Sequence, residues 1–319
     1  MTRHFRKTLV ALSLLALAAG AAAQDTIRLG NLKLAHFGAV AYIKEIAPGC
    51  GIRVEEKMFA KGLDVMQAII AGELDVGATA SEAAIQGRAS GAPIVVVAGF
   101  ARGGARLVAR PGTGIASVAQ LKGKKVGVTR GSIQEVLLMA ELARHRLSSK
   151  EVRLVYLAYA DLNGALLGGH IDAMMQSEPQ SSQAINQGFG VEVSKPYGTA
   201  IGEPVRTMVM TEKFYREQRP LAEKFMRCFV EATRTFIEQP AVAERYVRER
   251  MFKSQISAAD FRDALDNSPY TYDITAAHIQ RTTDVMTRTG VGRMARPPLA
   301  QDWVRTDLLA AAKRSLNIP

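Results

Sequence analysis

The sequences AIIAGELDV at residues 68–76 and ALLGGHIDA at residues 165–173 follow one pattern, although they start 97 positions apart. Each is an apolar helical run that stops at a glycine, Gly72 or Gly169, and restarts as a strand through an aliphatic residue and an aspartate. A glycine just past the last helical turn can take the left-handed conformation that releases the chain from the helix. The repeated unit predicts two similar lobes, each a mainly parallel α/β sheet flanked by helices.

Short strands alternate with helices on both sides of these segments. One series runs over residues 26–98, and a second follows the turn-rich sequence PGTG at residues 111–114. This alternation is typical of βαβ units and a parallel sheet. After Pro220 the chain is mostly helical, and we expect these helices to cover the first lobe. In open sheets of this kind, ligands bind beyond the carboxyl ends of the strands.

The first 23 residues have the features of a secretory signal peptide. Three basic residues within the first seven positions precede an apolar run at residues 9–19, and alanines at residues 21–23 offer a cleavage site. The run is too short and wrongly flanked to be a membrane span. We therefore expect an exported protein located in the periplasm. The predicted domains are a signal peptide at residues 1–23, a first lobe at residues 24–108 and 207–319, and a second lobe at residues 109–206, with crossings near residues 107–111 and 205–210.

Charge and cysteine content exclude several classes of function. The net charge is +11, or about +8 without the three cations of the signal peptide. Lys and Arg residues are scattered, whereas a nucleic-acid site needs them clustered on one face, so we expect no nucleic-acid binding. Cys50 and Cys228 are the only cysteines, which allows neither a disulfide framework nor a multi-cysteine metal site. We favour buried free thiols, although an oxidising compartment permits a bond between them.

Five motifs, in order, resemble those of a known family. They are GELDVG at residues 72–77, GAPI at residues 91–94, SVAQLKGKKVGV at residues 117–128, GHIDA at residues 169–173, and Glu178-Pro179. The chain resembles the periplasmic substrate-binding proteins of ABC importers, in the sulfonate, nitrate and thiamine-precursor (NMT1/THI5-like) group. The resemblance implies a type II periplasmic-binding-protein fold with a two-stranded hinge, a ligand in the cleft between the lobes, and an inner-membrane ABC permease as partner. We expect a monomer without a metal or another cofactor.

The loop between the strand at residues 125–128 and the helix that starts at Ile133 is the strongest ligand-site candidate. Free N–H groups and the helix dipole make such a terminus an anion site. The alternative role of Ser132, a simple helix cap, is the one we favour for that residue. The loop of Thr79 and Ser81 offers the same two alternatives in the first lobe. The predicted ligand-binding residues are Lys33, His36, Phe37, Thr79, Ser81, Arg102, Thr129, Arg130, Gly131, Ser132, Gln176, Glu178 and Glu203.

Several of these candidates have alternative roles. His36 or Lys33 would supply positive charge, although for Lys33 we favour a solvent-exposed position. Arg102 can grip a carboxylate or sulfonate with two hydrogen bonds, or face solvent. Glu178 would order cations, hold a hinge bond or accept from an amine. Glu203, or Arg206 beside it, would reach the cleft or form a pair between the lobes. These alternatives stay open on the sequence.

The sequence favours a binding protein over an enzyme. It contains no HExxH, GxSxG or P-loop spacing, and Asp75 and Asp172 fall at strand starts, where an aspartate stabilises turns. We predict the solute-binding component of an ABC importer, with a small organic anion, a sulfonate or carboxylate, in its cleft. The alternatives are the same fold with a pyrimidine or amine ligand, and a periplasmic sensor subunit for a membrane receptor. Closure of the two lobes would favour the ligand-bound population.

Overall fold

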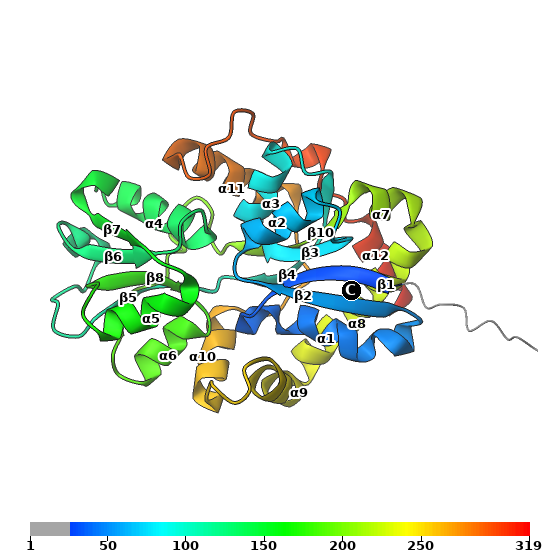
Figure 1. Cartoon of the computed structure of the whole chain (residues 1–319), viewed down its shortest axis with the longest axis horizontal. Coiled ribbons are helices and arrows are strands. Elements are labelled where there is room, and N and C mark those ends of the chain that lie inside the picture. Colours follow the sequence, from blue (N-terminus) through cyan, green and yellow to red (C-terminus); the bar gives the residue numbers. More distant parts are fainter. Residues whose placement is uncertain (1–25) are drawn as a thin grey trace, which may run out of the picture.

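The computed structural model describes residues 26–319, which form two lobes, each built on one mixed five-stranded sheet flanked by helices (Figure 1). The predicted signal peptide lies outside the described residues. No helix within residues 26–319 is both long and apolar enough to cross a membrane. The described chain therefore has the fold class that the repeated motif predicts.

The first lobe contains the strand order β2-β1-β3-β10-β4. β1, β2 and β3 run parallel, and β10 runs antiparallel to β3 and β4. Helices α2 and α3 cover one face, and α1 and α8 cover the other (Figure 1). The elements are β1 (Thr26–Leu32), α1 (Gly38–Ile46), β2 (Arg53–Phe59), α2 (Gly62–Ile70), β3 (Val76–Ala80), α3 (Ser81–Ala89), β4 (Ile94–Arg102), β10 (Val205–Thr211), α7 (Glu212–Glu217), α8 (Arg219–Glu238), α9 (Pro240–Arg245), α10 (Ala258–Asn267), α11 (Ala276–Thr289) and α12 (Asp307–Ser315).

The second lobe repeats this plan with the strand order β7-β6-β8-β5-β9. β6 runs parallel to β7 and β8, and β5 runs antiparallel to β8 and β9. Separate apolar clusters fill the two faces, one under α4 and one under α5 and α6. The elements are β5 (Ala105–Ala109), β6 (Lys125–Val128), α4 (Ile133–Arg144), β7 (Arg153–Tyr156), α5 (Tyr159–Leu167), β8 (Ala173–Ser177), α6 (Gln180–Asn186) and β9 (Val191–Ser194).

The repeated sequence motif has one structural role in both lobes. Gly72 and Gly169 follow α2 and α5 with φ values of 74° and 70°, in the left-handed region that glycine accepts without strain. The Asp75 carboxylate accepts a 3.0 Å hydrogen bond from the backbone N–H of Arg28, on β1. The Asp172 carboxylate accepts an equivalent 2.8 Å bond from the N–H of Lys125, on β6. Both aspartates therefore tie neighbouring strands together at the end remote from the strands' carboxyl termini.

The chain crosses between the sheets at two places that differ slightly from the predicted ones. β5 belongs to the second sheet, so the first crossing lies at Gly103-Gly104, before the predicted boundary at residue 108. Both glycines have positive φ values, 67° and 78°, which allow the sharp change of direction. The second crossing ends before Val205, because β10 already belongs to the first sheet.

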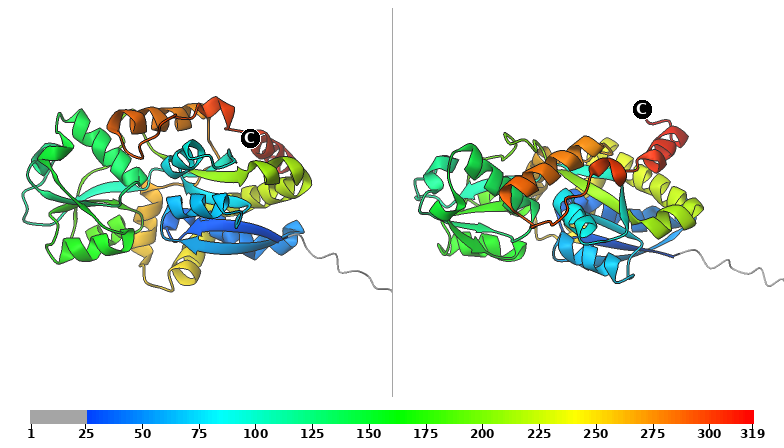
Figure 2. Two further views of the ribbon diagram at one scale, coloured as in Figure 1. Left: turned by 45° about the horizontal axis from the view of Figure 1, so that its top comes forward. Right: turned by 90° about the horizontal axis from the view of Figure 1, so that it is seen from above.

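The C-terminal helices do not cover the first lobe alone, which corrects the expectation from sequence. α10 packs against α6 of the second lobe, and α11 contacts both α3 and α4 (Figure 2). α10 is fixed there by Arg106, on β5, which pairs with the carboxylate of Asp263 at 2.8 Å. The amphipathic pattern of a helix shows which face is buried, but it does not show which lobe buries it.

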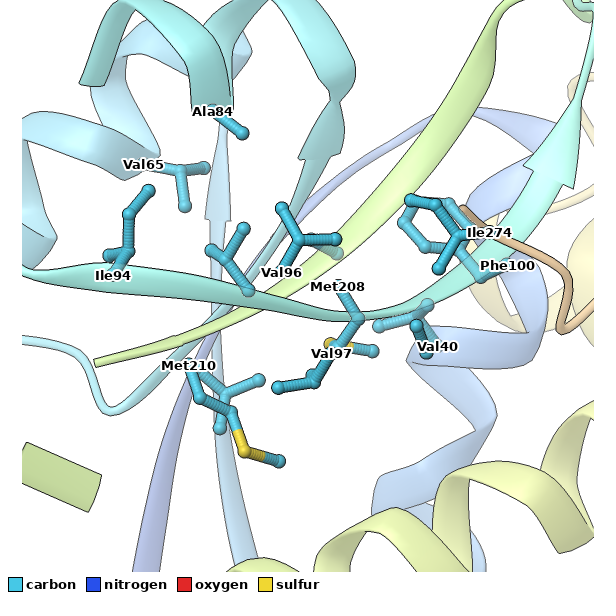
Figure 3. Close-up of a cluster of buried hydrophobic side chains, with 14 of the residues drawn as sticks. Val40, Val65, Ala84, Ile94, Val96, Val97, Phe100, Met208, Met210 and Ile274 are labelled. Atoms are coloured by element: carbon cyan, nitrogen blue, oxygen red, sulfur yellow. The ribbon is translucent and has the colours of Figure 1, made fainter. Parts of the chain in front are cut away.

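The core of the first lobe lies around the central strands β4 and β10 (Figure 3). Val96, Val97 and Phe100 on β4, and Met208 and Met210 on β10, are fully buried. Helices on both faces explain why β4 is a nearly continuous apolar run rather than an alternating one. These two strands are also the ones that lead into the crossings, so the hinge starts from rigid, packed elements.

Cys50 and Cys228 form a disulfide, so the preference for free thiols is wrong. Cys50 lies in the 3₁₀ turn after α1, and Cys228 lies on the buried face of α8. Because α1 and α8 pack together, the two Cα atoms stand 5.8 Å apart, within the range a disulfide requires. Sequence separation carries no information about this distance.

Candidate functional site

A small cavity of about 20 Å³, lined mostly by buried residues, lies between the lobes. The first lobe contributes loops that follow β1, β2 and β3, and the second lobe contributes loops that follow β6, β7 and the end of β8. The carboxyl ends of parallel strands thus meet there, the position at which open α/β sheets bind ligands. The lining residues are Leu32, Leu34, Phe37, Gly62, Ala80, Glu82, Ile133, Gln134, Tyr159, Ser177 and Arg206.

Arg206, on the crossing strand β10, is the cationic residue of this cavity, and its side chain is 1% exposed. Its Nε donates to Nε2 of His36 at 2.9 Å, and its Nη2 donates to the carbonyl oxygen of Gly103 at 2.7 Å. Its Nη1 is buried and has no hydrogen-bond partner within residues 26–319. A buried charge is costly unless it is paired, so this guanidinium favours an anion in the cavity.

His36 is a positioning group rather than a source of charge. Its Nε2 accepts a hydrogen bond from Arg206, so the proton of the neutral ring lies on Nδ1. Burial, followed by the charge of Arg206, holds the pKa of His36 well below its usual value. His36 is therefore neutral at pH 7 and fixes the orientation of the guanidinium. The idea that His36 supplies positive charge is wrong for this reason.

Glu82, at the start of α3, faces the same cavity from the first lobe. Its side chain is 4% exposed, and its Oε2 has no hydrogen-bond partner among the described residues. Burial raises the pKa of this carboxyl to about 7, although the charge of Arg206 and backbone N–H groups, including that of Ile133, act in the opposite direction. A carboxyl with this pKa exists in both protonation states near neutral pH.

Two helix N-termini flank the cavity from opposite lobes. α3 begins at Ser81 and α4 begins at Ile133. The N–H groups in the first turn of each helix have no partner within the helix and give this end a partial positive charge. Ser132 caps α4, because its Oγ accepts from the N–H of Glu135 at 3.3 Å and donates to the carbonyl of Thr129 at 2.6 Å. The Gly131 N–H donates to the Glu135 carboxylate at 2.5 Å, which fixes the loop.

The structure brings several predicted residues to this cleft. Phe37 lines the cavity, and His36 adjoins it through Arg206. Three buried hydroxyl groups nearby have no hydrogen-bond partner in the described part of the chain: Thr79 Oγ1, Ser81 Oγ and Thr129 Oγ1. Such groups are costly to leave unpaired, so they mark positions where a ligand would gain hydrogen bonds.

Two larger pockets share lining residues with the cavity. One, of about 350 Å³, is lined by Thr129, Arg130 and Tyr159, and the guanidinium carbon of Arg130 lies 3.6 Å from the centroid of the Tyr156 ring. The other, of about 430 Å³, is mostly apolar and has the exposed Lys33 at its edge. Lys33 thus lies at the entrance and not at the cavity, with its Nζ 5.2 Å from the centroid of the Phe252 ring.

Four other predicted residues lie outside the cavity lining. The buried Gln176 amide donates to the Tyr159 carbonyl at 3.1 Å, and so orders a lining residue. The buried Glu178 forms an ion pair with Nε of Arg106 at 2.9 Å and accepts a hydrogen bond from Asn267 at 2.7 Å, which corresponds to the hinge-bond alternative. The carbonyl of Arg102 accepts from Ser268 at 2.8 Å, on the hinge. Glu203 is exposed.

The sequence prediction missed the roles of Arg206, Glu82 and Tyr159. On the sequence, Arg206 is only an alternative to Glu203. An arginine inside the otherwise apolar strand sequence VRTMVM, at residues 205–210, is the signal that could have identified it, because a charge inside a buried strand needs a reason. No group of three or more metal-ligating side chains gathers anywhere within residues 26–319.

Two hinged lobes with a polar cavity at opposed strand ends define a fold of the periplasmic-binding-protein type. The chain belongs to the NMT1/THI5-like family, whose model matches residues 49–243. A curated Escherichia coli (strain K12) protein named for binding aliphatic sulfonates is 34% identical over 169 residues, which are 52% of this chain and 50% of the relative. The chain thus matches about half the length of that relative.

Solved structures share the fold over nearly the whole chain. The alkanesulfonate-binding protein SsuA from Xanthomonas axonopodis pv. citri, bound to MOPS, has a TM-score of 0.76 at 18% identity and covers 89% of this chain and 100% of its own. The periplasmic aliphatic sulphonate-binding protein SsuA from Escherichia coli has a TM-score of 0.75 at 21% identity, covering 90% and 99%. The desulfurization enzyme DszB also shares the fold, with a TM-score of 0.67 at 12% identity, covering 92% and 100%.

Proposed function

We propose that the chain is the periplasmic solute-binding component of an ABC importer and that it binds a small organic anion, a sulfonate or a carboxylate, at Arg206. The observation that carries the proposal is the buried guanidinium, whose Nη1 has no hydrogen-bond partner within residues 26–319 and which lines a cavity between two lobes. The helix N-termini of α3 and α4 add partial positive charge on either side. The names of the relatives are consistent with an anionic ligand.

The lining of the cleft suggests where the anionic head group and the organic tail of the ligand lie. The cavity beside Arg206 measures about 20 Å³, room for about one water molecule, so an anionic head group would enter it only when the lobes move apart. The 430 Å³ pocket shares Leu32, Leu34 and Tyr159 with the cavity and adds Phe59 and Phe252. An organic tail would therefore leave the cavity along an apolar wall. The two lobes would close on such a ligand, and an inner-membrane permease would recognise the closed form.

No enzymatic role is proposed. Both cysteines of the chain are joined in the disulfide, so no thiol nucleophile is available. The polar residues of the cavity lack the nucleophile–base pair that covalent catalysis requires, because His36 is bonded to Arg206 rather than to a hydroxyl or thiol. The fold likeness to DszB carries no activity to this chain at 12% identity.

Thermal unfolding of the mature chain with a panel of ligands tests the proposal. The panel contains aliphatic sulfonates, aliphatic and aromatic carboxylates, nitrate, amines and pyrimidines. A ligand at one hundred times its Kd adds about 2.7 kcal/mol to the unfolding free energy, which raises the Tm of a chain of this size by about 4 °C. We expect this shift from sulfonates or carboxylates. A response to amines or pyrimidines with none to anions would contradict the proposal.

Variants locate the site. Arg206→Met should abolish the shift, and Arg206→Lys should restore part of it, because a lysine keeps the charge but not the two-pronged geometry. The matched control is Arg153→Met, which removes an exposed arginine at the start of β7, at the end of the strand remote from the cavity. Circular dichroism confirms that each variant is folded. Retention of the full shift by Arg206→Met would place the ligand elsewhere.

A further inference from the structure

Glu82 and Arg206 approach the same small cavity from two different elements, α3 and β10. Both side chains are almost completely buried, at 4% and 1% exposure. Each also keeps one buried atom without a hydrogen-bond partner among the described residues: Oε2 of Glu82 and Nη1 of Arg206. A carboxyl that shares a small, mostly buried cavity with the anion-binding guanidinium must affect which ligand binds and at which pH.

Among the residues that line the cavity, Glu82 and Arg206 determine its net charge. His36 is neutral, because burial and Arg206 lower its pKa. Tyr159 is neutral as well, because burial and then the charge of Glu82 raise its pKa, and its hydroxyl donates to Gln134 at 2.6 Å. With Glu82 ionised, the cavity has no net charge, and a ligand anion must compete with the carboxylate for Arg206. With Glu82 protonated, the cavity carries one positive charge.

We propose that Glu82 is a specificity-determining residue that takes up one proton from solvent when an anion binds at Arg206, and then donates a hydrogen bond to that anion. This inference rests on the function proposed above. The anion and the carboxylate compete for one guanidinium, because two negative charges among buried side chains repel each other strongly. Protonation removes this repulsion and converts the free Oε2 from an acceptor into a donor.

The surroundings of Glu82 support an easy change of protonation state. Arg206 on β10 faces it and favours the ionised form, as do the N–H groups of Ala83 on its own helix and of Ile133 on α4. Tyr159, on α5, is the other titratable group that faces it. Burial opposes these groups and outweighs them, so the carboxyl titrates near neutral pH. An anion beside it would shift the titration to higher pH.

The proposal predicts the sign and slope of the pH dependence. At pH values below the pKa of the ligand-free carboxyl, Glu82 is already protonated and the affinity for an anion is at its maximum. Above it, each unit of pH should weaken the binding about tenfold, because one proton must be taken up for each anion bound. A permanently charged sulfonate isolates this effect, since the ligand itself does not titrate.

Isothermal titration of the mature wild-type chain with ethanesulfonate, or with the sulfonate that gives the largest thermal shift, measures the proton directly. Titrations in bis-tris, imidazole and Tris give a binding enthalpy that depends on the ionisation enthalpy of the buffer, and the slope is the number of protons taken up. Sulfonate buffers are excluded because they compete. We expect a slope that rises from near zero at pH 5.5 toward one at pH 8.5. A slope of zero throughout would overturn the proposal.

The variant Glu82→Gln provides the second test. The amide cannot ionise and still offers an N–H donor, so the variant should bind with the low-pH affinity of the wild type at every pH from 6 to 8.5. The control Glu73→Gln, at an exposed turn after α2, should keep the wild-type profile. Unchanged pH dependence in Glu82→Gln would refute the role of Glu82 and leave the proposed function intact.

Two further outcomes separate the proposals from each other. An aminated ligand, 2-aminoethanesulfonate, needs an ionised Glu82 to accept from its ammonium group. The contrary outcome is that this ligand binds more tightly than ethanesulfonate at pH 8, takes up no proton, and loses affinity in Glu82→Gln. These three results together would overturn the proton-coupled inference, and the proposed anion binding would stand. Failure of every anion to bind at both pH 6 and pH 8 would overturn the proposed function itself.

Discussion

Opening the disulfide should destabilise the chain strongly without affecting ligand binding. The bond between Cys50 and Cys228 closes a loop with a sequence separation of 178 residues, more than half of the described chain. A cross-link over a loop of this length removes enough entropy from the unfolded state to contribute about 5 kcal/mol at 25 °C. For a chain of this size, that free energy corresponds to a fall of about 8 °C in Tm.

The position of the bond explains why ligand affinity should stay the same. Cys50 precedes the amino end of β2, whereas the cavity lies beyond the carboxyl ends of the strands. We expect the double variant Cys50→Ala/Cys228→Ala, and the wild type with reductant, to lose a similar amount of Tm. Both should bind the anion with an affinity within about twofold of the oxidised protein.

The assay is differential scanning calorimetry of oxidised, reduced and double-variant protein, combined with titration of the anion. Mass spectrometry after alkylation without reductant shows whether the thiols are free. Two free thiols in protein exported to the periplasm, or an unchanged Tm in the double variant, would refute the reasoning. A loss of affinity that parallels the loss of stability would show that the bond also shapes the cleft.

Three further predictions follow from single residues. Asp172→Ala and Asp75→Ala each remove a tie between neighbouring strands, so chemical denaturation should show a loss of about 1–3 kcal/mol with unchanged anion affinity; lost affinity would contradict their placement away from the cleft. Gly104→Ala should weaken anion binding at least tenfold in a titration, because φ is +78° and its Cβ would lie 3.0 Å from Nη2 of Arg206; unchanged binding would show that the hinge tolerates the strain. Burial raises the pKa of Glu82 to about 7, so the free energy of unfolding of the ligand-free wild type, measured relative to that of Glu82→Gln at the same pH, should fall by about 3 kcal/mol as pH rises from 4.5 to 7; an equal pH dependence of both proteins in denaturation would refute the assignment.

Much of the fold follows from local patterns in the sequence. The glycines after α2 and α5 and the aspartates at the starts of the next strands are short-range signals, and they indicate the repeat without any knowledge of contacts. The placement of α10 and α11 against the second lobe is different. Their amphipathic faces show burial, but the partner is decided by pairs such as Arg106–Asp263, which are 157 residues apart.

The site was only partly predictable for the same reason. Helix-start loops such as residues 129–132 and 79–82 can be recognised locally, and both flank the cleft. The role of Arg206 depends on long-range contacts, because its side chain is held by hydrogen bonds to His36, 170 residues away, and to the carbonyl of Gly103. Glu178 shows the converse, because the structure pairs this acid, which the sequence places near the cleft, with Arg106, Asn267 and Ser182.

A crystal structure of the mature chain with the tightest-binding anion of the panel tests the central claim most directly. We expect the oxygen atoms of the anion within about 3 Å of Nη1 of Arg206, between the N-termini of α3 and α4, with the organic tail along Leu32 and Leu34. An anion bound at another place, with Nη1 of Arg206 directed at a protein group instead, would contradict the account.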